Sequence, residues 1–248
     1  MSRPSPESKI QKHDLRAEFD LLADEYRDMH RQNLGITGEA PEYFAEYKIA
    51  DLAKVRHKLK LSCRNILDFG SGVGNSLPYF RKYFSDSTLS CADISLRSIE
   101  IAQSRFPGSE AYLHLDDSIP LPDDSQDIVF SACVFHHIPH EEHAYWLREL
   151  LRVTKPGGIL AIYEHNPFNL LTVRAVNTCP LDVNARLIKA QTLQVDALAV
   201  GWASARIEYK LFFPAVFAIL RPFEPYLTWL PLGGQYRLLV VKPQLGAP

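Results

Sequence analysis

A strand, a glycine turn and a helix start follow one another at residues 65–75, NILDFGSGVGN, and this segment constrains the fold more than any other. The apolar run 66–69 predicts a short buried strand. Residues 77–84 predict the helix that follows, with Pro78 in its first turn, where the missing N–H costs nothing. Because glycine lacks a Cβ and tolerates positive φ, backbone N–H groups in the turn 70–74 can approach a ligand, and the helix end adds free donors. The segment therefore predicts a ligand-binding edge.

The acid before the turn indicates what kind of ligand binds. The dinucleotide fingerprint G-x-G-x-x-G fails in both registers, because Asn75 or Leu77 occupies the place of its third glycine. Asp68 instead precedes the first glycine by two residues. A carboxylate at the end of a buried strand suits a ligand that offers positive charge or N–H donors, which a pyrophosphate does not. NAD is therefore not the predicted ligand.

At this segment the chain resembles a known family. DFGSGVG is similar to motif I of the class I S-adenosylmethionine-dependent methyltransferases, of the small-molecule kind called methyltransferase type 11/12, and the resemblance runs from roughly Phe19 to Lys242. It implies an α/β fold with a Rossmann-like, seven-stranded, mostly parallel sheet and helices on both faces. It also implies S-adenosylmethionine as the cofactor and S-adenosylhomocysteine as the product. The positions that match motif I, and are expected to bind the cofactor, are Asp68, Gly70, Ser71, Gly72 and Gly74.

A second acid follows the second predicted strand. Asp93 lies 23 residues after Gly70, the distance at which a carboxylate meets ribose hydroxyls in doubly wound folds. The competing interpretation is that Asp93 or Ser95 caps the helix 96–105 by accepting its free N–H groups. The two roles are compatible. The resemblance places Ile94 beside the adenine.

Two acids, Asp116 and Asp117, follow the third predicted strand, 111–115. The family places an acid here that accepts the adenine amino group. The segment is about one residue shorter than the family's common pattern, so either aspartate fits that role. We prefer Asp116.

The N-terminal part precedes the first strand. Residues 1–14 are polar and predict a disordered lead-in without a signal peptide. The apolar stripe in 15–29 predicts a helix. The resemblance makes this helix a lid over the cofactor with Tyr26 as a contact, and a packing helix is the alternative.

The rest of the chain is expected to form a single domain, 15–248. The resemblance divides it into N-terminal lid helices, 15–62, a cofactor-binding core, 63–167, and a substrate-side segment with the last strands, 168–248.

Four histidines lie in eight residues after the fourth predicted strand, 127–135, in HHIPHEEH, which begins at His136. Imidazoles beside carboxylates are good zinc ligands. However, the family commonly has a His-His pair here, and the two later histidines fall at a helix start where exposed polar groups cost little, so we expect no metal. His136 or His137 is a candidate general base, because an imidazole with a pKa of about 6.5 can take a proton from a hydroxyl.

The fifth predicted strand, 159–163, ends in Glu164 and His165. Neighbouring parallel strands end at the same edge of a sheet, so these side chains should lie beside the histidines that follow the fourth strand. Glu164 and His165 are therefore candidates for catalysis or substrate contact. The alternative is that they bond only to each other or to the backbone.

An insert rich in Phe, Leu, Trp and Pro, 214–234, separates the last two predicted strands, 205–213 and 236–242. Its apolar run is too short and too broken by charges and prolines to span a bilayer. Packing on the core is the preferred interpretation. The alternatives are a homo-oligomer interface and the wall of an apolar substrate pocket.

Composition limits the partners. Lys and Arg number 27 against 29 Asp and Glu, a formal net charge of -2, which gives no electrostatic reason to expect nucleic acid. No transmembrane segment is predicted. The cysteines show no C-x-x-C spacing and mostly lie in or beside apolar runs, which predicts reduced residues in a cytoplasmic protein.

These features together predict an enzyme that transfers a methyl group from S-adenosylmethionine to a small organic acceptor. The polar strand ends favour O-methylation, since a hydroxyl acceptor needs a base. N- or C-methylation is the alternative reaction. A methyltransferase-like protein that binds or assembles without catalysis is the alternative of another class.

Overall fold

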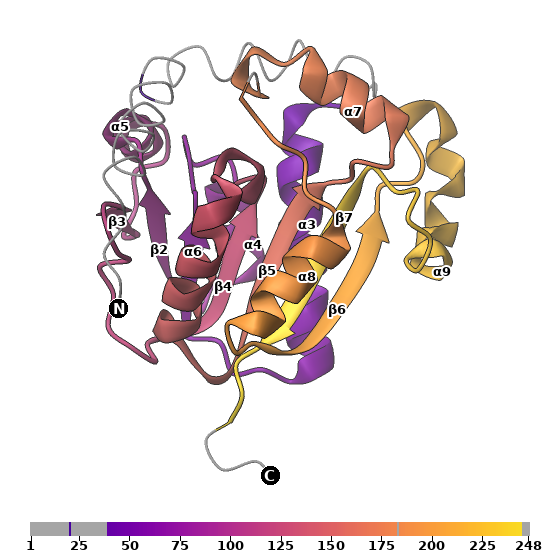
Figure 1. Cartoon of the computed structure of the whole chain (residues 1–248). Helices are drawn as coiled ribbons and strands as arrows, with labels where there is room; N and C mark the ends of the chain where they lie inside the picture. Colours follow the sequence, from indigo (N-terminus) through magenta and orange to yellow (C-terminus); the bar gives the residue numbers. More distant parts are fainter. Residues whose placement is uncertain (1–19, 21–38, 183, 245–248) are drawn as a thin grey trace.

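The described strands are β1 (Asn65–Phe69), β2 (Thr88–Asp93), β3 (Ala111–His114), β4 (Gln126–Ala132), β5 (Thr154–His165), β6 (Ala203–Lys210) and β7 (Gln235–Val241). They form one sheet in the order β3-β2-β1-β4-β5-β7-β6 (Figure 1). The computed structural model describes residues 20, 39–182 and 184–244. β7 is antiparallel to β5 and β6, and the other pairings are parallel. This confirms the predicted Rossmann-like α/β fold.

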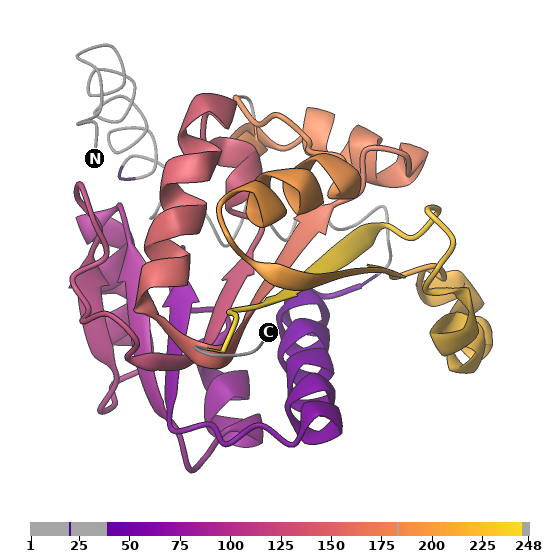
Figure 2. The ribbon, with the colours of Figure 1, turned by 60° about the horizontal axis from the view of Figure 1, so that its bottom comes forward.

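Helices cover both faces of the sheet (Figures 1 and 2). One face carries α3 (Pro41–Leu59), α4 (Leu77–Tyr83) and α5 (Leu96–Arg105), and the other carries α6 (His140–Val153) and α8 (Ala190–Ala199). The helix α7 (Leu170–Asn177) lies over the edge at which the parallel strands end. The remaining described helices are η2 (Phe135–His137), η3 (Pro180–Asp182), η4 (Ala215–Phe223) and α9 (Glu224–Leu227).

The core lies in two apolar clusters, one on each face of the sheet. In the central strand β4, Ile128 and Phe130 belong to the cluster under α3 and α4, and Val129 belongs to the cluster under α6 and α8. All three are fully buried, as expected of a parallel strand that is covered on both faces. Burying one such side chain contributes about 1.5–3 kcal/mol, so the strands are firmly held and their ends are fixed in space.

The end of β4 differs from the predicted strand, which ran to residue 135. Cys133 adopts the left-handed conformation, with φ 58°, and its N–H donates to the carbonyl oxygen of Tyr163. This residue therefore ends the strand and turns the chain into η2. As a result, His136 lies beside the end of β5.

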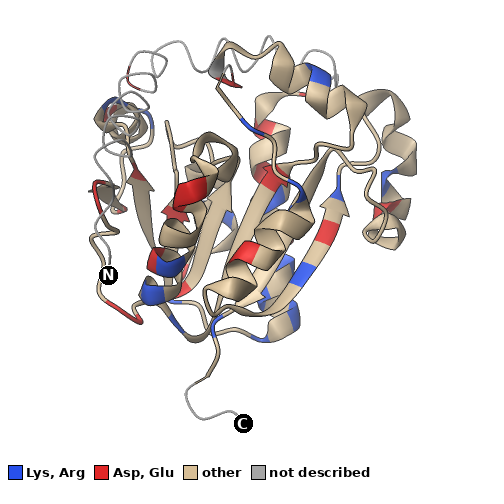
Figure 3. Cartoon of the chain, viewed as in Figure 1, with Lys and Arg blue, Asp and Glu red and all other residues tan. Residues whose placement is uncertain are grey.

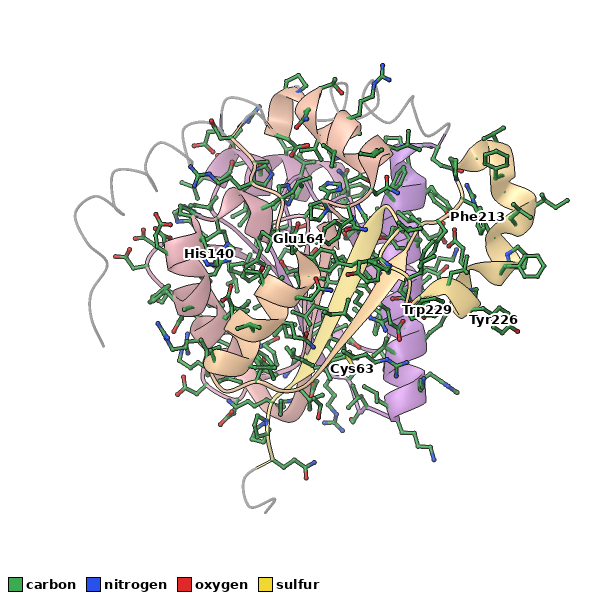
Figure 4. All side chains as sticks on the ribbon, turned by 45° about the vertical axis from the view of Figure 1, so that its right-hand side comes forward. Cys63, His140, Glu164, Phe213, Tyr226 and Trp229 are labelled. Atoms are coloured by element: carbon green, nitrogen blue, oxygen red, sulfur yellow. The ribbon has the colours of Figure 1, made fainter. Side chains whose placement is uncertain are left out.

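The insert between β6 and β7 also differs from the prediction. The helices η4 and α9 contain no buried residue, so the expectation that the insert packs on the core was wrong. Its polar side chains face inward: the Glu224 carboxylate accepts the N–H groups of Phe212 and Phe213 at 2.9 and 3.0 Å, and Arg221 donates to the Phe213 carbonyl at 3.2 Å. The apolar side chains consequently project into solvent, as Figure 4 shows for Tyr226. A homo-oligomer interface through this insert stays a prediction.

Some predictions fall outside the described residues. The lead-in 1–14 does so completely, as does Tyr26, and only Asp20 of the predicted helix 15–29 is described. The next predicted lid helix is α3, and its first turns lie beside the strand ends. Within the described ranges, none of the helices combines the length and the apolar character that crossing a membrane requires.

Candidate active site

The glycine turn after β1 brings backbone to the edge of a cavity. Gly70, Gly72 and Gly74 have φ values of 77°, 52° and 80°, which disfavour any residue with a Cβ. A Cβ on Gly70 would lie 2.3 Å from Val134, and one on Gly74 would lie 2.8 Å from Leu77. A Cβ on Gly72 would meet nothing within 4 Å. Gly70 and Gly74 therefore allow close packing of the chain, whereas Gly72 presents its backbone to open space.

Asp93 connects the end of β2 to this turn. Its carboxylate accepts the N–H of Gly72 at 2.7 Å and the N–H of Ser95 at 2.9 Å. Burial raises the pKa of Asp93, and these backbone donors act against that effect. Ser95 itself caps α5 by accepting the N–H of Ser98 at 3.0 Å. The cap is therefore the serine, and the Asp93 carboxylate lies at the cavity wall.

Asp68 lies deeper in the same wall and is 2% exposed. Burial and the neighbouring Asp93 raise the pKa of Asp68 to about 8, although Lys48 acts to lower it. Beside it, the Ser71 hydroxyl is buried and has no hydrogen-bond partner among the described residues. Two carboxyl groups, an unpartnered hydroxyl and the open space above Gly72 fit a ligand that carries a cationic amine and ribose hydroxyls, as S-adenosylmethionine does.

One cavity of about 360 Å³ connects this region to the ends of β4 and β5. The predicted site residues that line it are Asp68, Gly70, Ser71, Gly72, Asp93, Ile94, His136, His137 and His165. Gly74 and Glu164 lie behind the wall rather than in it. Asp116 and Asp117 are exposed beyond β3 and do not line the cavity, so their contact with adenine stays a prediction.

A buried ion pair stands behind the opposite end of the cavity. The Glu164 carboxylate lies 2.6 Å from Nδ1 of His136, and it also accepts the N–H groups of Val134 and Phe135 at 2.9 and 2.8 Å. Burial disfavours charge on His136, but Glu164 and Asp182 outweigh it and raise the pKa of His136 to about 10. Burial likewise opposes the Glu164 charge, and His136 lowers the pKa of Glu164 to about 2. Glu164 therefore orients His136 from inside the protein.

The second histidine of the pair differs sharply from the first. Burial and the neighbouring charge of His136 lower the pKa of His137 to about 3, so its imidazole is neutral. Asp182 of η3 lies close to both rings: its Oδ1 is 3.5 Å from Nε2 of His136 and 3.5 Å from Nε2 of His137. Burial opposes its charge, but the neighbouring His136 outweighs burial and lowers the pKa of Asp182 to about 2.

A thiol and an imidazole from adjacent strand ends form the third part of the site. The ring centroid of His165 lies 5.3 Å from that of His136, and Nε2 of Gln235 lies 3.4 Å from Nδ1 of His165. Cys133 is next to them, with the Lys48 ammonium 3.6 Å from its sulfur. Burial raises the pKa of the Cys133 thiol, but His165 and Lys48 outweigh this and lower it to about 7. Lys48 is therefore a buried part of the cavity wall rather than a solvated lysine.

The other two histidines of HHIPHEEH lie outside the cavity. His140 is exposed, as expected for a helix start. His143 is buried, so the expectation that both are exposed was wrong for this residue. One turn into α6 it faces the core, where its Nε2 lies 3.1 and 3.0 Å from the carbonyl oxygens of Phe135 and Ile138.

Sequence reasoning missed three residues of the site: Asp182, Cys133 and Gln235. Asp182 lies in a segment without regular periodicity, and nothing local relates it to the histidines. Cys133 lies three residues before the first histidine of the run. Its position near the end of a predicted strand was the signal that could have placed it in the site. Gln235 starts β7, and only the antiparallel pairing of His165 with Gln235 brings it to the site.

Parts of the chain are similar to known proteins. A family model described as a methyltransferase domain matches residues 67–162. The chain is 27% identical over 142 residues to a phthiotriol/phenolphthiotriol dimycocerosates methyltransferase of Mycobacterium leprae (strain TN), covering 55% of this chain and 52% of that protein. It is 27% identical over 119 residues to a tRNA N(3)-cytidine methyltransferase of Bos taurus, covering 44% and 32%. The chain thus spans between about a third and about half the length of these relatives.

The fold has similar solved structures. A S-adenosylmethionine-dependent methyltransferase from Archaeoglobus fulgidus superposes with a TM-score of 0.61 at 19% identity, over 80% of this chain and 94% of that one. At this identity the similarity concerns the fold alone.

Proposed function

We propose that the chain is a class I S-adenosylmethionine-dependent methyltransferase, as the methyltransferase-domain match over residues 67–162 supports, and that it transfers a methyl group to an oxygen atom of a small organic acceptor. One observation carries the proposal. A single cavity has acids and a glycine turn at one end and three imidazoles at the other. S-adenosylmethionine supplies a methyl group on a positively charged sulfur. Holding donor and acceptor in one cavity in the correct orientation is worth up to roughly 7–11 kcal/mol of a reaction barrier.

We assign the cofactor contacts as follows. Asp93 accepts hydrogen bonds from the ribose hydroxyls, and Asp68 faces the cationic amine, whose charge favours ionisation of this carboxyl. The backbone at Gly72 provides close approach. Asp116 or Asp117 is the proposed adenine contact.

His165 is the residue that we propose as general base. His136 already holds a proton between Glu164 and Asp182 and cannot accept another, and a pKa of about 3 makes His137 a weak base at neutral pH. Of the imidazoles that line the cavity, this leaves His165. Its proposed role is to take the proton of an acceptor hydroxyl as the oxygen becomes nucleophilic.

The cavity mouth supports an acceptor with an apolar body. Phe44, Leu171, Phe212 and Phe213 line it, and the insert supplies Pro214, Arg221 and Gly234. The predicted alternative, in which the insert walls a substrate pocket, is therefore the one we retain. Reduced cysteines, none of them in a disulfide, support the proposed cytoplasmic location.

Methylation of RNA is the second candidate, because one relative is named as a tRNA methyltransferase. Charge argues against it. In the view of Figure 3, Lys and Arg are interspersed with Asp and Glu over the described ranges, whereas an RNA-binding face concentrates basic residues. The acceptor screen described next includes tRNA to decide between the two.

The test has a binding stage and a turnover stage. Calorimetry with S-adenosylhomocysteine should show micromolar affinity in the wild type, weakened at least tenfold in Asp93→Ala, because hydrogen bonds to a charged group contribute about 1.5–3 kcal/mol each. Turnover is then screened on phenols, hydroxy acids, amines and tRNA. His165→Gln should lower kcat/KM for a hydroxylated acceptor by about 10²- to 10⁴-fold without changing cofactor affinity. His140→Gln, at an exposed histidine outside the cavity, is the matched control.

Three results would contradict the proposal. Absence of cofactor binding to the wild type removes the enzyme interpretation and favours a binding or assembly protein. Turnover on amines or tRNA alone removes O-methylation. Unchanged kcat/KM in His165→Gln removes the assigned base.

A further inference from the structure

We propose that His136, His137 and Asp182 bind a divalent transition-metal ion at the acceptor end of the cavity. The three residues come from η2 and η3, which lie far apart in the sequence and meet at the ends of β4 and β5. Binding of the ion follows from their geometry. Its role, which is to hold the oxygen of the acceptor, rests on the proposed function.

The spacing of the three ligand atoms suits a metal of this class. Asp182 Oδ1 lies 3.5 Å from Nε2 of each histidine, and all three atoms lie within 4.8 Å of one another. A tetrahedral site with bonds of about 2.0–2.2 Å has ligand atoms about 3.4 Å apart. The carboxylate is therefore already at the coordination distance from both rings. Two imidazoles and one carboxylate are a donor set typical of zinc and iron(II).

An unpartnered buried nitrogen points to a ligand in the same place. Nε2 of His136 is buried and has no hydrogen-bond partner within the described part of the chain, and the residue is 2% exposed. Its other ring nitrogen, Nδ1, lies 2.6 Å from Glu164, so a hydrogen bond there directs Nε2 toward Asp182. Binding of the ion would displace the proton that Nε2 carries in the ion-free protein. Glu164 is fixed in turn by the N–H groups of Val134 and Phe135. A carboxylate behind a histidine in this way is the usual support of a metal-binding imidazole.

The ion would keep an open position on the cavity side. All three residues line the cavity, and three protein ligands leave a fourth position for water or substrate. An acceptor that binds there through a hydroxyl oxygen would have the pKa of that hydroxyl lowered by the ion. His165 lies next to this position, with its ring centroid 5.3 Å from that of His136. The geometry therefore selects acceptors that carry a hydroxyl.

A second group of similar composition provides a comparison within the same chain. His140, His143 and Asp196 also place three ligand atoms within 4.8 Å of one another. The carboxylate is farther from the histidines, at 3.8 and 3.9 Å, and the His140 side chain is 64% exposed. These residues do not line the cavity. Variants of the two groups therefore distinguish a site built into the cavity from binding by surface histidines.

The experiment is a titration of the chelator-treated full-length protein with Co²⁺, followed by its visible absorption bands and by competition with Zn²⁺. We expect binding of Co²⁺ that weakens at least a hundredfold in Asp182→Asn and in His137→Ala and is unchanged in His140→Ala. A parallel titration with S-adenosylhomocysteine reports whether each variant is folded.

The outcomes separate this inference from the proposed function. If the wild type binds S-adenosylhomocysteine but no Co²⁺, or if Asp182→Asn binds Co²⁺ as tightly as the wild type, the metal site is refuted and the proposed function stands. Loss of the Co²⁺ bands in His140→Ala instead of Asp182→Asn also refutes it. If Co²⁺ binds as expected but no acceptor is methylated, the proposed function fails and the metal site remains.

Discussion

Replacement of Glu164 by glutamine isolates the charge of the buried pair behind the cavity. The amide oxygen of Glu164→Gln has the same size and position as one carboxylate oxygen and can still accept the N–H groups of Val134 and Phe135, which lie 2.9 and 2.8 Å away. The substitution therefore leaves no backbone donor unpaired. What it removes is the negative charge 2.6 Å from His136.

The expected loss follows from the pKa of Glu164. Its carboxyl has an ordinary pKa of 4.5, and although burial would raise it, His136 lowers the pKa to about 2. At about 1.4 kcal/mol per pH unit this corresponds to about 3 kcal/mol of stability. The pKa shift of His136 is larger than that of Glu164, but Asp182 also contributes to it. The shift of Glu164 is therefore the better measure of the interaction between Glu164 and His136. Breaking a buried ion pair by removing one partner typically costs a similar amount, about 3–5 kcal/mol.

The stability that the ion pair contributes should be lost both in acid and in base. The folded-state pKa of Glu164 is depressed, so its contribution is present above pH 4.5 and is lost as the pH falls toward about 2. The folded-state pKa of His136 is raised, so its contribution is present below pH 6.5 and is lost as the pH rises toward about 10. The difference in the free energy of unfolding between the wild type and Glu164→Gln should therefore be largest between pH 4.5 and pH 6.5, the ordinary pKa values of the two groups.

Urea unfolding followed by circular dichroism measures this difference. Near the middle of that window we expect Glu164→Gln to unfold with about 3 kcal/mol less free energy than the wild type, and near pH 9.5 the difference should shrink to about 1 kcal/mol or less. Glu100→Gln, at a carboxylate that is 64% exposed, is the control and should change stability by less than about 0.5 kcal/mol. A loss below about 1 kcal/mol, or an equal loss at both pH values, would refute the reasoning.

Two further predictions concern the glycine turn and the far side of the sheet. Gly70→Ala should lower the free energy of unfolding by more than about 2 kcal/mol, because its Cβ would meet Val134 at 2.3 Å. Gly72→Ala should lower it by only about 1–2 kcal/mol, from the strain of a left-handed backbone, because its Cβ would meet nothing within 4 Å. Calorimetry should nevertheless show weaker S-adenosylhomocysteine binding in Gly72→Ala. Equal stability of the two variants would contradict this. Burial raises the pKa of Asp51, but Arg237 and Lys210 outweigh it and lower the pKa below 3.8. Asp51→Asn should therefore lower the free energy of unfolding by about 3 kcal/mol or more at neutral pH. This difference from the wild type should fade as the pH falls through the folded-state pKa of Asp51. Thermal unfolding at neutral and acidic pH checks this, and a difference that grows in acid would contradict it.

The parts of the fold, and of the geometry of the candidate site, that agree with the prediction are those encoded by neighbours in the sequence. The turn after β1 and the acid at the end of β2 follow from local spacing, and the meeting of Glu164 with His136 follows from the rule that adjacent parallel strands end together. Asp182 could not be predicted, because its place depends on how a segment without periodicity folds back over the strand ends. The insert after β6 was predicted wrongly for a related reason: apolar content indicates burial only on average, and here Glu224 turns the polar side of the segment inward.

The buried pair of Glu164 and His136 bears on function more than on stability. Removing one partner is costly, but replacing a whole buried ion pair by apolar side chains is often neutral or stabilising, so the pair is weak evidence of a need for stability. What apolar side chains cannot do is direct an imidazole nitrogen. Glu164 fixes the orientation of the His136 ring while two backbone N–H groups fix Glu164, and the ring presents its unpartnered Nε2 to Asp182 and the cavity. The desolvation of the Glu164 and His136 charges therefore serves to fix the position of Nε2 of His136, and this position is that of an atom that binds a ligand.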